Sequence, residues 1–167
     1  SFSDFKRYVK DTFVFKMNRF VPVDINFTSF VIATLTRCKI NKINNGDNSF
    51  LYELSFKFEK ERDKILLQNV LKFIKSINCK YEEKTENHKV IINVFNRPLH
   101  DFITSLLIND IKSIINSSEE CQQYFIDNLF TNRDSINVGL NVAIQIKELF
   151  LYNKKVLGIK RYTEGVI

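Results

Sequence analysis

The sequence is short of the residues that build disulfide frameworks, metal sites and long loops. Its 167 residues include no Trp and only two Pro, two His, three Cys and four Gly. So little Gly and Pro argues against a disordered chain. Cys38, Cys79 and Cys121 are far apart, so we expect neither disulfides nor a zinc site, and we expect a reducing compartment. Because no run of about 18 apolar residues occurs, no membrane span is expected.

Apolar residues and positive charge are what the chain has in quantity. Hydrophobic residues make up 44% of it, which suits one domain with a buried core. The net charge of +6 favours a polyanionic partner, most commonly nucleic acid, although a basic protein without such a partner is the alternative. Heavy use of Phe, Asn, Ile and Lys is typical of AT-rich coding genomes, which makes a mitochondrial location an expectation.

Apolar periodicity predicts an ordered series of elements in the first two thirds of the chain. The basic, Phe-rich segment 1–20 has roughly helical spacing and is expected to be an amphipathic extension. Residues 21–115 predict helix, two strands, helix, two strands, helix, with Asp24 or Asn26 capping the first helix. The predicted helices are Asn26–Arg37, Arg62–Ile77 and Leu99–Leu107, and the predicted strands are Lys39–Ile43, Phe50–Phe58, Lys80–Lys84 and Lys89–Phe95. This order indicates an α+β fold, with helices on one face of an antiparallel sheet.

Residues 116–167 predict a second, shortened pass through the same order. Ser117 and Glu120 have the spacing of a capping box at the start of a helix over Glu119–Phe130. An extended segment over Ser135–Leu140, a helix over Val142–Tyr152 and a short terminal strand follow. The chain is therefore interpreted as two repeats, the second without its full first hairpin.

Residues of the second half carry a resemblance to a known family. The helix Glu119–Phe130 leads to Arg133, and a later helix contains Ala143, Ile146, Leu149 and Phe150, followed by Leu157-Gly158-Ile159. This pattern resembles a repeat of the LAGLIDADG homing endonucleases, and Phe27–Ile40 is similar to the opening of another. The resemblance covers roughly Val21 to Ile159 and implies an αββαββα repeat followed by the shortened one. Ile32 and Asn128 stand where the family has small residues between its two opening helices, which implies a wider or shifted helix crossing.

The resemblance implies a specific place for catalysis, and this sequence departs from the family there. Each opening helix of the family ends in an acidic residue, and two such carboxylates hold divalent metals that activate water. Arg37 and Arg133 occupy these places, and arginine can neither bind a cation nor act as a base. We therefore expect no cofactor and no nuclease activity. A shift of one residue would put Asp134 in place of Arg133 and leave one carboxylate, so an active Mg²⁺-dependent DNA endonuclease is the alternative.

What the resemblance leaves is nucleic-acid binding through a sheet face. The residues predicted to bind are Arg37, Lys39, Asn41, Ser55, Lys57, Arg133, Asn137 and Asn141, because Lys and Arg contact phosphates and Asn reaches base edges. Glu53 on the same face opposes binding, and ordinary solvated strands carry similar residues. We expect a non-catalytic binder, of RNA before DNA, in an RNA–protein assembly such as an organellar ribosome or as a splicing helper. A protein-interaction module that uses the N-terminal segment is the third hypothesis.

Overall fold

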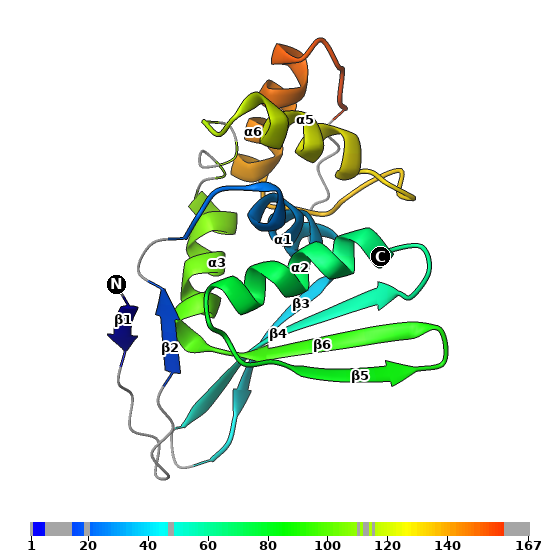
Figure 1. Cartoon of the computed structure of the whole chain (residues 1–167). Coiled ribbons are helices and arrows are strands. Elements are labelled where there is room, and N and C mark those ends of the chain that lie inside the picture. Colours follow the sequence, from blue (N-terminus) through cyan, green and yellow to red (C-terminus); the bar gives the residue numbers. More distant parts are fainter. Residues whose placement is uncertain are drawn as a thin grey trace, which may run out of the picture.

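The fold is α+β, with one four-stranded antiparallel sheet and a smaller two-stranded one (Figure 1). The computed structural model describes residues 2–5, 15–18, 21–46, 49–109, 111, 114 and 116–158. The strands are β1 (Phe2–Phe5), β2 (Phe15–Asn18), β3 (Cys38–Asn44), β4 (Phe50–Glu59), β5 (Glu82–Glu86) and β6 (Lys89–Phe95). The helices are α1 (Ile25–Arg37), α2 (Lys64–Ser76), α3 (Arg97–Asn109), α5 (Glu119–Asn128) and α6 (Leu140–Tyr152). Among the described residues, no helix has both the length and the apolarity to cross a membrane.

The main sheet confirms the two predicted hairpins and the predicted placement of helices on one face. Its strand order is β3-β4-β6-β5, with every neighbouring pair antiparallel. Leu54, Phe56 and Phe58 alternate along β4 and are fully buried, because this face of the sheet lies under α1, α2 and α3 (Figure 1). In the part of the chain that the structure describes, no helix lies on the opposite face, which we call the open face; an antiparallel sheet tolerates this arrangement.

Helix α1 is the centre of the molecule. The Asp24 carboxylate caps it by accepting a hydrogen bond from the amide of Phe27 at 2.9 Å, as one of the two predicted caps would. Nine of its residues are buried, on several sides of the helix, since the sheet and α2 flank it on one side and α5 on another (Figure 1). Such burial is expected of a helix that is apolar on most sides.

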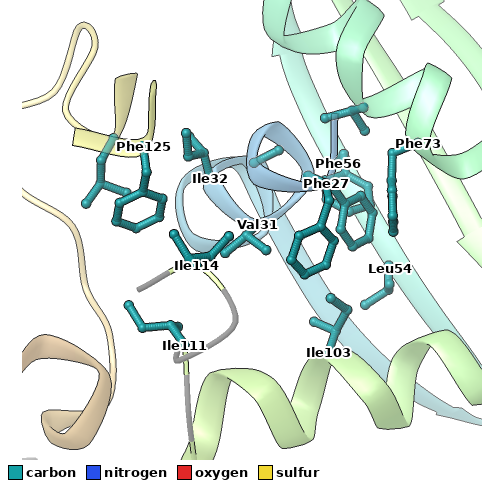
Figure 2. Close-up of a cluster of buried hydrophobic side chains, with 14 of the residues drawn as sticks. Phe27, Val31, Ile32, Leu54, Phe56, Phe73, Ile103, Ile111, Ile114 and Phe125 are labelled. Carbon is teal, nitrogen blue, oxygen red and sulfur yellow. The ribbon is translucent and has the colours of Figure 1, made fainter. Parts of the chain in front are cut away.

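The core runs from the sheet through α1 into the second half of the chain. The ring centroid of Phe30 lies 4.6 Å from that of Phe73 in α2 and 5.4 Å from that of Phe56 in β4. On the far side of α1, Ile32 lies toward Phe125 of α5 (Figure 2). All five side chains belong to one buried cluster, so the two halves of the chain share a core.

One prediction for the chain ends is corrected by the structure, and the other lies outside the described residues. Residues 2–5 and 15–18 are paired antiparallel strands and not turns of the amphipathic helix expected over 1–20. Strand β2 lies beside α3 (Figure 1). The rest of that segment, and the short strand expected at the C-terminus, lie outside the described residues.

The second half differs from the prediction in the residue that caps α5 and in residues 135–139, which form no strand. Ser118, and not Ser117, caps α5, because its hydroxyl accepts from the amide of Cys121 at 3.3 Å. The capping-box spacing of Ser117 and Glu120 is therefore one residue out of register. Residues 135–139 form no strand, and α6 begins at Leu140. Within 116–158 the second repeat consists of two helices and no sheet.

Candidate nucleic-acid interface

The ends of the two opening helices bring Arg37 and Arg133 into one region. Arg37 is the last residue of α1, and Arg133 lies in the turn that follows α5. The turn closes through the Arg133 amide, which donates to the carbonyl of Phe130 at 3.0 Å. Because α1 packs against α5, the two guanidinium groups lie close enough for the charge of Arg37 to act on the pKa of Arg133.

Arg37 is held by a carboxylate that the sequence did not single out. Its Nε and Nη2 donate to the two carboxylate oxygens of Asp63 at 3.1 and 3.0 Å, a bidentate arrangement. The side chains are only 5% and 3% exposed. Contact between Arg37 and a phosphate, as predicted from the sequence, would therefore require this pair to open.

Asp63 also fixes the turn between β4 and α2. Its Oδ2 accepts from the amide of Glu59 at 2.9 Å, and its own amide donates to the carbonyl of Glu59 at 2.8 Å. Burial alone would raise the pKa of the carboxyl. The hydrogen bonds from Arg37 and from the Glu59 backbone, with the charges of Arg37 and Arg62, nevertheless hold the pKa below its ordinary value. Asp63 is thus an ionised carboxylate that joins α1, β4 and α2.

Arg133 is the more accessible arginine of the region. Partial burial and the neighbouring charge of Arg37 lower the pKa of its guanidinium, the charge of Arg62 adds to this, and Asp63 opposes it. An arginine stays protonated at neutral pH in spite of such a shift. Arg133 and Asp134 are both exposed, and the side chain of Arg62 is 48% exposed. Arg62 and Arg133 are therefore the cations of this region that an anion can reach.

The contact between α1 and α5 contains a small polar cluster. Ser29 of α1 donates to the hydroxyl of Tyr124 of α5 at 3.0 Å, and Asn69 of α2 donates to both oxygens at 3.2 Å. Ile32 is buried in the same contact. The side-chain amide of Asn128 donates a hydrogen bond to the carbonyl of Tyr124, in its own helix, at 2.8 Å. This hydrogen-bonded cluster joins three helices at the centre of the molecule.

The open face of the main sheet carries the predicted strand residues. Cross-strand partners share a face, so the pairing Lys39↔Ser55 and Asn41↔Glu53 places these residues opposite the core, with Lys57 beside them. Asn41 donates to Glu53 at 2.8 Å, and Ser55 donates to Asn93 at 2.8 Å. The charged residues of this face alternate in sign: Lys39, Glu53, Lys57, Glu59, Glu82, Lys84, Glu86 and Lys89. The face is therefore close to neutral, with several polar groups already paired.

Asn137 and Asn141 do not lie on that face, contrary to the prediction. They border a separate groove of about 490 Å³, which lies between the end of α1, the outer edge of β3 and the start of α6. The other lining residues are Thr34, Leu35, Cys38, Ile40, Val138, Gly139 and Leu140. Residues 135–139, predicted to be extended, form no strand beside the sheet, and Asn141 lies in the first turn of α6.

The residues at the helix ends do not fit the divalent metal that the family resemblance implies. Asp63 is the buried carboxylate nearest to Arg37, and both its oxygens are engaged by that arginine. In the part of the chain that the structure describes, no group of three or more His, Cys, Asp or Glu is placed to hold a cation. Mg²⁺ requires several oxygen ligands, and guanidinium groups cannot supply them. No catalytic step through a metal follows from this geometry.

The fold is that of homing endonucleases. A structure from a set of mesophilic variants of the homing endonuclease I-DmoI matches with a TM-score of 0.51 and 11% identity, over 78% of this chain and 78% of that one. I-DmoI in complex with DNA and Mn matches with a TM-score of 0.51 and 12% identity, again over 78% of each chain. The resemblance expected from the sequence is thereby confirmed at the level of the fold. No family model and no curated protein matches the sequence.

Sequence reasoning found the arginines and missed their partners. Asp63 stands 26 residues from Arg37, and nothing in its local sequence marks it as the buried partner of an arginine. Tyr124 and Asn69 were missed for the same reason. The one usable signal was the position of Asp63 in the first turn of the amphipathic helix predicted over Arg62–Ile77, where an acidic side chain is favourable.

Proposed function

We propose that this protein is a non-catalytic nucleic-acid-binding protein built on the homing-endonuclease fold. The observation that carries the proposal is the pair of arginines at the ends of α1 and α5, where the family resemblance places metal-binding acids. A site built from guanidinium groups attracts phosphate and repels divalent metal ions.

The loss of cleavage is supported by the way Asp63 is used. A carboxylate could serve a metal only if its oxygens were free, and those of Asp63 are bonded to Arg37 and the Glu59 amide. Asp134 is one exposed carboxylate beside Arg133, which is too few for the two-carboxylate chemistry of the family.

Binding is supported by charge and by what similar structures hold. The net charge is +6, and I-DmoI, which shares the fold, has been solved with DNA. As part of the proposal we keep RNA ahead of DNA, a place in a ribonucleoprotein and a mitochondrial location. These rest on the sequence alone.

The test is binding of the full chain to a hairpin RNA and to a duplex DNA across a salt series, with Mg²⁺ present and the products run on a gel. We expect salt-sensitive binding without strand cleavage, because phosphate contacts release counterions. Arg133→Gln should weaken binding and reduce the slope of log K against log salt by about 0.7 to 0.9, the value of one phosphate contact.

The matched control is Lys154→Gln, which removes the same charge from an exposed residue at the far end of α6. It should bind like the parent protein. Metal-dependent cutting would restore the endonuclease alternative, and absence of binding at low salt would leave the protein-interaction module.

A further inference from the structure

Helix α2 presents an exposed face of a single charge sign. Its charged residues are Lys64, Lys72 and Lys75, and it contains no acidic residue. All three are exposed, as is Gln68 between them. At 100° per residue these four side chains fall within about one quarter of the helix circumference, opposite the buried Val70, Phe73 and Ile74. They form one row, which we call the α2 basic face.

Further basic residues extend the α2 basic face at both ends. Lys60 and Arg62 precede the helix and Lys80 follows it, and all three are exposed. Arg62 is also one of the charges felt by Arg133, so the row begins at the arginine region. The thirteen residues of α2 span about 20 Å, enough to follow several phosphates of one strand.

The lysines of this face form no ion pair within the described chain, and the one exposed acidic residue of its N-terminal extension is Glu61, between Lys60 and Arg62. None of Lys64, Lys72 and Lys75 forms an ion pair with another described residue. A solvated helix usually mixes signs, because like charges three or four residues apart are unfavourable by about 0.2 to 0.5 kcal/mol. Lys64 also stands at the helix N-terminus, where a cation is unfavourable. This arrangement is suited to an anionic partner.

The open face of the sheet offers no comparable row. Its lysines alternate with glutamates, and Lys89 lies 3.6 Å from the Glu59 carboxylate. A phosphate backbone on that face would meet as many negative as positive side chains.

We propose that the α2 basic face binds the phosphate backbone of the nucleic acid, so that the partner lies against the helix layer and not against the sheet. This inference rests on the proposed function and assigns it a surface. Lys64, Lys72 and Lys75 supply the charge contacts, and the Gln68 amide supplies a neutral donor for phosphate or sugar oxygens. Arg62 and Arg133 continue the contact at the start of the helix.

The experiment compares two triple variants of the full chain that remove the same amount of charge. One is Lys64→Gln, Lys72→Gln and Lys75→Gln. The other is Lys39→Gln, Lys57→Gln and Lys84→Gln on the open sheet face. Glutamine is a good helix former, so α2 is preserved, and circular dichroism with a thermal melt checks both folds. Binding of a hairpin RNA and a duplex DNA is measured from about 50 to about 200 mM salt.

We expect the α2 triple variant to lose about tenfold or more in affinity and to flatten the salt slope by about 2 to 3, as for three lost phosphate contacts. The sheet triple variant should stay within about twofold of the parent, and an α2 triple with Arg in place of Lys should keep both affinity and slope.

If the parent protein binds and the α2 triple variant binds equally well, the α2 assignment is wrong while the proposed function stands. Equal losses in both Gln variants also overturn the assignment, since charge alone would explain them. A parent protein that binds neither probe sinks the proposed function itself.

Discussion

At the scale of single residues, the ion pair between Arg37 and Asp63 determines what the end of α1 can do. A buried charge is tolerated because its partner and backbone donors satisfy it, and both conditions hold for Asp63. The sequence marked Arg37 by its place in a family pattern. It did not identify Asp63 as the partner of Arg37, because the contact joins elements that meet only in the folded chain.

Removing either partner of this pair should cost stability. Arg37→Ala leaves the Asp63 carboxylate buried without its cation, and we expect the free energy of unfolding to fall by about 3 to 5 kcal/mol in urea titrations. Arg62→Ala, which removes the half-exposed neighbour 3.9 Å from the same carboxylate, is the control and should change stability by less than about 0.5 kcal/mol. Similar small losses in both variants would show that Asp63 is solvated.

The same pair gives a pH dependence of defined sign. Burial raises the pKa of Asp63, but Arg37, the Glu59 amide and the charge of Arg62 together lower it by more, so the folded-state pKa is below the unfolded value of about 3.9. The stability that this carboxylate contributes is therefore complete above about pH 4 and is lost as the pH falls through the folded-state pKa. Urea unfolding at a series of acid pH values should show this loss, and Asp63→Asn should flatten that part of the profile. An unchanged profile in the variant would contradict the assignment.

At the scale of elements, the structure separates patterns that fold locally from patterns that need a neighbour. The alternation of Leu54, Phe56 and Phe58 was predicted because one side of a strand faces the core. Ile136 and Val138 alternate in the same way and pack on the core, yet residues 135–139 form no strand. These residues have no hydrogen-bonded partner strand. Whether such a partner exists cannot be read from the local sequence. The helical spacing of the first Phe residues was misleading because local sequence does not reveal partner strands either: β1 and β2 pair with each other.

Loss of the N-terminal cap of α1 should destabilise the protein. Asp24→Ala removes the acceptor for the Phe27 amide, and we expect a loss of about 0.5 to 2 kcal/mol in the free energy of unfolding. Asn26→Ala, at the other residue considered as a cap, should have no such effect because Asn26 lies inside the helix. Equal losses would mean that the two residues share the capping role.

At the scale of the whole molecule, the shared core makes residues 21–109 and 116–158, the segments predicted to be two repeats, one unit. The second repeat has no sheet of its own within 116–158, so its helices bury their apolar side chains against α1 and α3. The two-repeat organisation was predicted from element order. The dependence of the second repeat on the first was not, because only packing shows it.

A single cooperative transition should follow from this arrangement. Phe125→Ala in α5 and Phe73→Ala in α2 each remove a fully buried ring and should each cost about 3 to 5 kcal/mol. Differential scanning calorimetry should show both variants lowering the Tm of the same single transition. Two separate transitions, with each variant shifting only one, would mean that the repeats unfold independently.

Under the proposed function, the ion pair at the end of α1 also bears on what it would take to place a metal-binding acid there. Arg37→Asp alone would place two carboxylates side by side in a buried position, which is unfavourable unless a cation binds between them. Such a variant would be destabilised, and its stability would rise with divalent metal concentration. A second acid would still have to replace Arg133. Placing an acid at position 37 is therefore a step that weakens the fold before any metal site is complete.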